Sequence, residues 1–226
     1  MSKTCVLIPS YNEAKSIGRI VGELKAKGLS PCVVDDGSTD DTAKIAESCG
    51  AIVLRHEKNK GKGASLREGF IYALKEGFDK VLIMDGDGQH SCDDLQAFIQ
   101  KAEASNCGII VGNRMATTKQ MPVLRIMVNR FMSGLISLIA GQHIPDTQCG
   151  FRLVKKDLLQ KVNLLTSKYE TESEILIKAA RLGFKIESLP VKTIYSGQKS
   201  QINPFIDTLR FLRFIILESI RRDNNA

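Results

Sequence analysis

The chain has 226 residues, 43% hydrophobic and 25% charged, a balance that excludes a disordered or collagen-like protein and fits one domain with a sizeable core. The formal charge of +7, from 32 basic and 25 acidic residues, favours an anionic partner such as a nucleotide or a lipid head group. The only adjacent basic pair near the C-terminus is Arg221-Arg222, so we expect no nucleic-acid tail and no nucleic-acid partner.

The first half of the chain alternates apolar runs with amphipathic or capped segments. Apolar runs predict strands at residues 4–9, 32–34, 51–54, 80–84 and 108–111, and the intervening patterns predict helices at 13–27, 38–48, 64–75 and 91–104. This order predicts an α/β fold with a mostly parallel central sheet and helices on both faces.

The second half of the chain is less regular. It predicts a strongly apolar helix at 123–140, a polar turn at 146–152, a helix at 172–182, strand structure at 184–195 broken near Pro190, and a final helix at 205–222. We expect residues 1–200 to form one domain and residues 201–226 to form a C-terminal amphipathic helix.

Polar loops follow four of the predicted strands, and two of these loops are rich in carboxylates. They are Pro9-Ser-Tyr-Asn-Glu13, Asp35-Asp-Gly-Ser-Thr-Asp40, Asp85-Gly-Asp-Gly-Gln-His90 and Gly112-Asn-Arg114. Since ligands of open α/β sheets bind at the carboxyl ends of the strands, we expect these loops to form one site.

Asp85 and Asp87 can converge on one hard cation, Mg²⁺ or Mn²⁺, and Gly86 between them allows a close backbone approach. Such an ion would bridge two donor phosphates and neutralise a departing diphosphate. The alternative is a solvated acidic turn, which the position after a buried strand disfavours.

Two further loops offer donor contacts. In Asp35-Asp-Gly-Ser38 one acid can accept a nucleobase N–H, and the other can turn the chain and cap a helix. Lys62, in the segment Asn59-Lys-Gly-Lys-Gly63 before a helix, can contact phosphate, with a solvated basic turn as the alternative.

These loops, together with Asp146-Thr-Gln-Cys-Gly-Phe-Arg152, resemble the motifs of family 2 glycosyltransferases. Within that family they resemble the dolichol-phosphate mannose synthase branch and its bacterial polyprenyl-phosphate relatives. The motifs run in the expected order from residue 4 to about 200. The resemblance implies a GT-A fold and an inverting, metal-dependent hexosyltransferase that uses a nucleotide-diphosphate sugar.

The resemblance also implies roles for individual residues. It implies a metal or diphosphate contact at Asp85, Asp87 and Gln89, with Asp87 as a catalytic residue. Donor contacts are implied at Pro9, Tyr11, Glu13, Val34, Asp36, Lys62, Asp85, Gly86, Arg114, Arg130 and Lys199. The segment around Lys199 has fewer basic residues than the eukaryotic pattern.

The acceptor decides whether a general base is needed. A lipid phosphate, the acceptor of the resembling branch, presents an oxygen that is already an anion. A hydroxyl acceptor needs a base, for which Asp146 is the candidate. The alternative for Asp146 is a structural role, fixing the turn and pairing with Arg152.

Location is inferred from what the sequence lacks. Six cysteines without CxxC spacing and an N-terminus without a signal-peptide pattern indicate a reducing, cytoplasmic setting. No uninterrupted apolar run reaches the ~20 residues of a spanning helix. We expect peripheral contact with the inner face of a membrane, through the final helix, with packing against the sheet, a second copy or a membrane-protein partner as alternatives.

Two other functions fit part of the pattern. A sugar-phosphate nucleotidyltransferase shares a related sheet, but it would need a glycine-rich basic loop after the first strand. A non-catalytic nucleotide-sugar or anionic-lipid binding protein would not need both Asp85 and Asp87.

Overall fold

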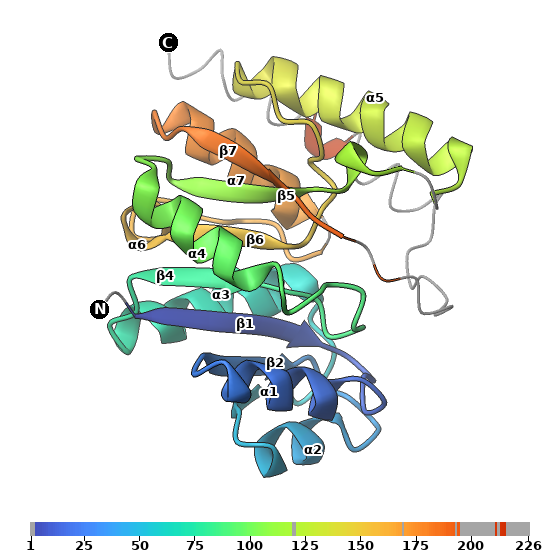
Figure 1. Cartoon of the computed structure of the whole chain (residues 1–226), viewed down its shortest axis with the longest axis vertical. Coiled ribbons are helices and arrows are strands. Elements are labelled where there is room, and N and C mark those ends of the chain that lie inside the picture. The colour runs from blue at the N-terminus through green and yellow to red at the C-terminus, as the bar shows by residue number, and fades with distance from the viewer. Residues whose placement is uncertain are drawn as a thin grey trace.

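The computed structural model describes residues 3–118, 121–168, 170–192, 194, 211 and 213–215. Its first half alternates strands and helices as the sequence predicts (Figure 1). The elements are β1 (Thr4–Ser10), α1 (Ile17–Ala26), β2 (Ser30–Asp35), α2 (Thr42–Ser48), β3 (Ile52–Arg55), α3 (Lys62–Lys75), β4 (Lys80–Ile83), α4 (Leu95–Ala104) and β5 (Ile109–Asn113).

The second half contains both predicted and unpredicted elements. A 3₁₀ turn η1 (Arg114–Ala116) precedes the long helix α5 (Val123–Ala140), and the remaining elements are β6 (Arg152–Lys155), α6 (Lys156–Leu159), α7 (Glu170–Arg181) and β7 (Ile186–Pro190). The predicted final helix lies largely outside the described residues.

The strands form one seven-stranded sheet in the order β3-β2-β1-β4-β6-β5-β7. β6 runs antiparallel to both of its neighbours, and the other strand pairings of this sheet are parallel. The expected mostly parallel α/β sheet is therefore confirmed.

β6 is the strand that the sequence analysis missed, because Arg152 was assigned to a polar turn. The Arg152 side chain is instead buried, and its guanidinium donates hydrogen bonds to the main-chain carbonyls of Thr147, Cys149 and Glu172. These bonds satisfy its donors and allow a charged residue to begin a central strand.

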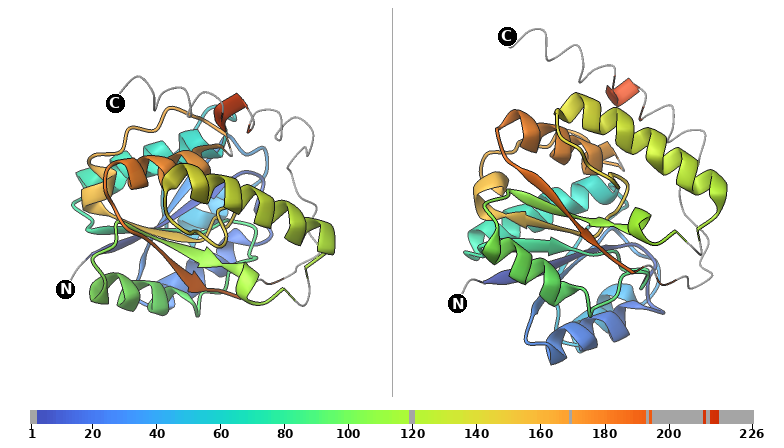
Figure 2. Two further views of the ribbon diagram at one scale, coloured as in Figure 1. Left: turned by 90° about the horizontal axis from the view of Figure 1, so that it is seen from above. Right: turned by 45° about the horizontal axis from the view of Figure 1, so that its top comes forward.

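Helices cover both faces of the sheet (Figure 2). α1, α2 and α4 lie on one face, and α3, α6 and α7 lie on the other, with α5 packed outside α7. The central strands β1 and β4 read as continuous apolar runs because both of their faces are covered. This arrangement directs the carboxyl ends of β1, β2, β4 and β5 to one edge, where the polar loops begin.

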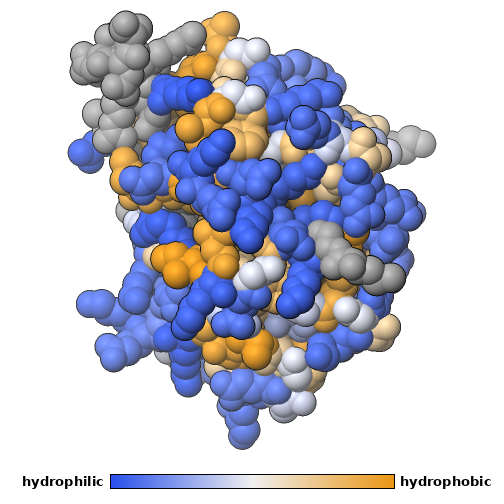
Figure 3. All heavy atoms as spheres, turned by 90° about the vertical axis from the view of Figure 1, so that its left-hand side faces the viewer, coloured by the Kyte–Doolittle hydropathy of each residue, from blue (hydrophilic) through white to orange (hydrophobic). Residues whose placement is uncertain are grey.

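The surface and the C-terminal segment complete the description. The face in Figure 3 is mostly hydrophilic, with apolar residues in separate patches. Of the predicted C-terminal helix, residues 211 and 213–215 are described as helical. Phe211, Phe214 and Ile215 are buried with the core, and Arg213 is exposed. For these apolar residues the packing alternative holds.

Candidate functional site

The first two polar loops are locked together by hydrogen bonds. Asn12, in the left-handed region with φ 57°, donates its N–H to the Ser38 hydroxyl at 2.9 Å and accepts the Thr39 N–H at 2.9 Å. The Glu13 N–H donates to the Thr42 hydroxyl at 2.8 Å. Residues of the loop before α2 and the first residue of that helix therefore also fix the loop after β1, and the two loops form one edge of the site.

Three carboxylates, those of Glu13, Asp85 and Asp87, gather where the loops after β1 and β4 meet. Burial, and next the charge of Asp87, raise the pKa of Glu13 to about 7. Burial and the charge of Asp85 likewise raise the pKa of Asp87. At both groups burial is the first cause and like charge the second, so both effects oppose ionisation of Glu13 and Asp87.

Asp85 differs from the other two acids because a lysine reaches it. Burial would raise the pKa of Asp85, but the charge of Lys62, together with His90 and Arg114, lowers it to about 2. The Lys62 ammonium donates to Asp85 Oδ1 at 2.5 Å and lies 2.6 Å from Glu172 Oε1, an ion pair. Lys62 is thus a paired, largely buried cation, and the alternative of a solvated basic turn is wrong.

A second buried ion pair joins Arg114 to Asp146. The Arg114 guanidinium donates to both carboxylate oxygens, at 2.8 and 2.9 Å, and the Arg114 main-chain N–H donates at 3.0 Å. The Asp146 side chain is completely buried. Burial alone would lower the pKa of Arg114, but the hydrogen bonds to Asp146 outweigh this effect and raise it. Asp146 therefore pairs with Arg114, and the predicted pairing with Arg152 is wrong, because Arg152 faces main-chain carbonyls.

Glycines let the loops approach closely. A Cβ on Gly150 would lie 2.7 Å from Asp85 Oδ2, and one on Gly86 would lie 2.6 Å from the Ser10 hydroxyl. The Gly86 carbonyl accepts a hydrogen bond from the Ser16 hydroxyl. The Asp146–Arg152 segment therefore lies against the acidic loop, as the order of the motifs implies.

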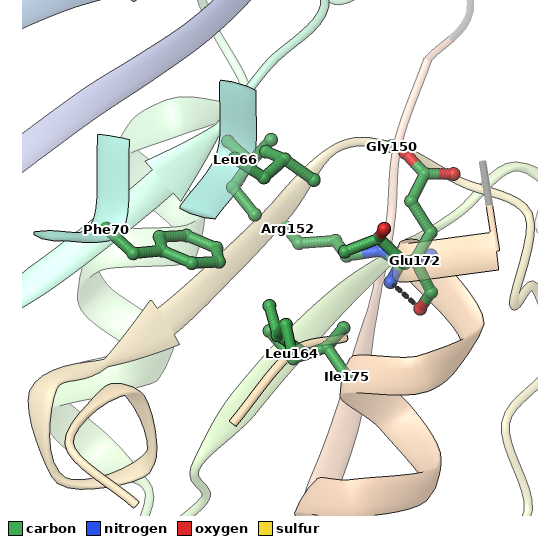
Figure 4. Close-up of a pocket in the computed structure, with 9 residues that line it drawn as sticks. Leu66, Phe70, Gly150, Arg152, Leu164, Glu172 and Ile175 are labelled. Carbon is green, nitrogen blue, oxygen red and sulfur yellow. Dashed lines mark hydrogen bonds between the residues drawn. The ribbon is translucent and has the colours of Figure 1, made fainter. Parts of the chain in front are cut away.

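A small pocket lies beside Gly150, between α3 and α7 (Figure 4). Apolar side chains of both helices line it, and Arg152 and the start of α7 close one end. The lining residues include Leu66, Phe70, Leu164 and Ile175.

His90 and Gln89 hold the end of the acidic loop in place. The Asp85 N–H donates to His90 Nδ1 at 3.2 Å, so Nε2 carries the ring proton of the neutral form. The ring stacks on Phe151 with centroids 4.8 Å apart, so it packs against the Asp146–Arg152 segment. The Gln89 N–H donates to Asp87 Oδ1 at 2.9 Å, and its carbonyl accepts from Ile194.

Both acids after β2 are buried and engaged. Asp35 accepts the Ser38 N–H and pairs with Arg55. Asp36 Oδ1 lies 2.6 Å from His56 Nδ1, within hydrogen-bonding distance. Asp36 also accepts hydrogen bonds from the main-chain N–H groups of Lys60, on Oδ1, and Gly61, on Oδ2, at 2.8 Å each. A carboxylate offers about four acceptor positions, and these three contacts leave one position on Asp36 Oδ2 unused.

The remaining predicted donor-binding residues differ in burial and in their contacts with the other site residues. Pro9 and Tyr11 are half-buried at the end of β1, whereas the Val34 side chain is fully buried, so a ligand could meet only its main chain. Arg130 is exposed on α5, and within the described ranges no hydrogen bond or ion pair joins it to the other site residues. Lys199 lies outside the described residues.

The acidic loop after β4 offers carboxylate oxygens to a divalent cation. Within residues 3–118, 121–168 and 170–192, no three His, Cys, Asp or Glu side chains are arranged to hold an ion by themselves. Mg²⁺ sites commonly use one or two carboxylates with water and substrate phosphates. Asp85 and Asp87 supply two carboxylates, and Asp87 has a pKa raised by burial and by the charge of Asp85, so the residues fit an ion that arrives with a phosphate ligand.

Glu172 is a site residue that the sequence does not single out. It lies in the first turn of α7, where an acid also suits the positive end of the helix dipole. Only the fold shows that α7 brings it to Lys62. No spacing in the sequence connects these two residues.

The comparisons with known proteins agree with this fold. The family described as "Glycosyl transferase family 2" matches residues 5–162. The chain therefore belongs to this glycosyltransferase family and is an enzyme of that class.

Relatives within the family bear names from the polyprenyl-phosphate branch. UDP-N-acetylglucosamine–dolichyl-phosphate N-acetylglucosaminyltransferase of Methanococcus voltae is 32% identical, over 94% of this chain and 95% of that protein. Dolichyl-phosphate beta-glucosyltransferase of Saccharomyces cerevisiae is 30% identical, over 97% and 76%. Polyprenol monophosphomannose synthase of Mycolicibacterium smegmatis is 27% identical, over 84% and 76%.

Solved structures show the same fold. Mannosyl-3-phosphoglycerate synthase from Rubrobacter xylanophilus has a TM-score of 0.78 at 19% identity, covering 100% of this chain and 76% of that one. Glucosyl-3-phosphoglycerate synthase from Mycobacterium tuberculosis, solved with Mn²⁺ and UDP, has a TM-score of 0.73 at 18% identity, covering 98% and 80%. The expected GT-A fold is confirmed.

Proposed function

We propose that this glycosyltransferase moves a sugar from a UDP- or GDP-sugar to a polyprenyl phosphate, by one inverting displacement that requires Mg²⁺ or Mn²⁺. The observation that supports this most strongly is the gathering of Glu13, Asp85 and Asp87 at the carboxyl ends of β1 and β4, where burial and like charge raise the pKa values of Glu13 and Asp87. Such a cluster calls for a cation at the place where a donor diphosphate would arrive.

Asp85 and Asp87 are the residues that would hold the ion, with Gln89 keeping Asp87 in position through its N–H. When bound, the ion would neutralise the charge that develops on the departing nucleotide diphosphate. The crystal structures of glucosyl-3-phosphoglycerate synthase with UDP and either Mn²⁺ or Mg²⁺ support a divalent ion in this fold.

The donor would lie along the carboxyl edge of β1, β2 and β4. Pro9, Tyr11 and the free acceptor position on Asp36 would meet the nucleoside. Lys62 and Arg114 would face the phosphates. Lys62 already pairs with Asp85 and Glu172, so the donor phosphate would either use its third N–H or replace one of these carboxylates.

The acceptor assignment rests on the relatives and on the state of Asp146. Three relatives carry polyprenol or dolichyl phosphate in their names. A phosphate oxygen is already an anion and needs no general base. The Asp146 carboxylate already receives two hydrogen bonds from the Arg114 side chain, so within this proposal it holds Arg114 in position and abstracts no proton.

Membrane contact would use α5, which is oriented with its apolar side outward. The helix buries Asn129 and Ser133, and the Ser133 hydroxyl is hydrogen-bonded to Thr147. Its exposed apolar residues are Val123, Leu124, Met127, Val128, Phe131 and Leu138. Exposed Arg125 and Arg130 add positive charge that suits anionic lipid.

By length and composition α5 also passes as a membrane-spanning helix, with a mean hydropathy of 1.5 over 18 residues. The sequence analysis had judged its uninterrupted apolar part too short. Ile136 is fully buried, and α5 packs on α7, so we place the helix in the plane of the membrane surface at the cytoplasmic face. This keeps the peripheral location expected from the sequence and moves the main contact from the C-terminal segment to α5.

The proposal is tested by incubating the protein with labelled UDP- and GDP-sugars and either polyprenyl phosphate or 3-phosphoglycerate, with Mn²⁺ or with a chelator. We expect Mn²⁺-dependent formation of a glycosylated polyprenyl phosphate, identified by its mass. Transfer only to 3-phosphoglycerate would contradict the acceptor, and equal transfer with the chelator would contradict the metal.

A further inference from the structure

His56, immediately after β3, lies between two carboxylates. Its ring is 1% exposed, with Nδ1 2.6 Å from Asp36 Oδ1 and Nε2 2.6 Å from Glu68 Oε2. When both acids are ionised, both ring nitrogens must carry protons for these contacts to be hydrogen bonds. The three side chains then form a charged chain that links α3 to the end of β2.

Asp36 passes this connection to the loop that leads into α3. Its carboxylate accepts the main-chain N–H groups of Lys60 and Gly61. On its other side the loop lies against Gly37, where an added Cβ would be 2.6 Å from the carbonyl carbon of Lys58. Gly37 has φ 75°, a conformation that favours glycine. The loop is therefore held by Asp36 and fits closely over the backbone beside it.

The position of this loop decides where Lys62 lies. Lys62 is the first residue of α3, directly after Gly61, and its ammonium reaches Asp85 and Glu172 across the site. Glu68 belongs to the same helix. The linked side chains of Glu68, His56 and Asp36 thus connect the second turn of α3 to the loop that begins the same helix.

Of the three side chains His56 and Asp36 are buried and Glu68 is partly exposed, and burying ionised groups is a poor way to obtain stability alone. Removing ionised groups from water costs several kcal/mol each, and apolar residues of similar size commonly serve a fold as well or better. Here the linked side chains of Glu68 and His56 lead to Asp36, which keeps one acceptor position for a ligand, and Asp36 in turn binds the loop before Lys62. These side chains therefore control two groups on the donor side of the site.

We propose that His56 and Glu68 are positioning residues for the nucleotide-sugar donor: they orient Asp36 and, through the Lys60–Gly61 main chain, Lys62. This rests on the proposed use of a nucleotide-diphosphate donor. Neither residue touches the donor in this account. Their loss should weaken donor binding and leave acceptor binding unchanged.

The test compares Glu68→Gln and His56→Gln with the matched control Glu76→Gln, which alters an exposed acid at the end of the same helix. The dissociation constants of UDP and GDP are measured calorimetrically with Mn²⁺, and KM is measured separately for donor and acceptor. A donor Kd or KM raised about 10-fold, equivalent to about 1.4 kcal/mol, is expected for His56→Gln, with a smaller rise for Glu68→Gln.

Acceptor KM should stay within about two-fold of wild type for every variant, and the Glu76→Gln control should match wild type throughout. Since the Glu68 side chain is 42% exposed, Glu68→Gln provides a readout even where His56→Gln fails to fold. A lowered melting temperature with unchanged donor Kd in the folded variants would mean a purely structural role and would overturn the inference.

A double-mutant cycle tests whether His56 acts through Asp36. If it does, Asp36→Asn/His56→Gln binds the donor no more weakly than Asp36→Asn alone. Fully additive losses would overturn the proposed route. Wild-type protein that binds neither UDP nor GDP would overturn the proposed function and this inference with it. Wild-type binding combined with unaffected variants would overturn this inference alone.

Discussion

Phe131→Ser should weaken binding to anionic lipid vesicles without unfolding the protein. The Phe131 side chain is 68% exposed on the apolar side of α5. Full burial of a large apolar side chain is worth about 1.5–3 kcal/mol, so 68% of that gives about 1–2 kcal/mol on entering a membrane. At 1.4 kcal/mol per factor of ten, the partition coefficient should fall about 5- to 30-fold.

Ile71→Ser is the matched control, because Ile71 is also 68% exposed but lies on α3. Binding of both variants to vesicles with about 30% anionic lipid would be measured by flotation and sedimentation. The negative surface potential of such vesicles attracts basic segments. The account predicts weaker binding for Phe131→Ser alone and an unchanged melting temperature. Equal binding by wild type and Phe131→Ser, or equal loss in both variants, would refute the assignment of α5.

Further substitutions test the buried charges. Asp146→Ala leaves Arg114 buried without its counter-charge, at a cost of about 3–5 kcal/mol, so thermal unfolding should shift down by about 6–20 °C, and a shift under about 2 °C would contradict the pair's importance. Burial opposes ionisation of Glu174, but hydrogen bonds, first that from Lys178, lower its pKa. The ionised Glu174 carboxylate therefore adds to the free energy of unfolding above the unfolded pKa of about 4.3, and this stabilisation is lost as the pH falls through the lower folded value. The melting temperature of Glu174→Gln should lie below that of wild type at neutral pH, and this deficit should narrow below about pH 4. A constant deficit would contradict this. Asp87→Ala should abolish transfer with the melting temperature kept or raised, since it relieves repulsion between acids, and retained turnover would reject the metal assignment.

The first half of the fold was predictable because its strands are buried on both faces. Their short apolar runs alternate with amphipathic segments, and all five predicted strands and four helices are present. Parallel strands bring their carboxyl ends to one edge, so the meeting of Glu13 with Asp85 and Asp87 followed from strand order alone.

The second half resisted prediction because its polar residues are used internally. Arg152 begins a central strand because main-chain carbonyls surround its guanidinium. The apolar pattern of α5 predicted a helix but not its orientation, since Ser133 is buried by a hydrogen bond to Thr147. Contacts across the fold, such as Lys62 with Glu172, leave no local pattern.

The most direct test of the account is a crystal structure of the protein with Mn²⁺ and UDP or GDP, with the ion located by anomalous scattering. The account predicts one Mn²⁺ peak about 2.0–2.3 Å from an oxygen of Asp87 or Asp85 and from diphosphate oxygens. Nucleotide bound with both carboxylates turned away from the ion, or Mn²⁺ bound elsewhere, would contradict it.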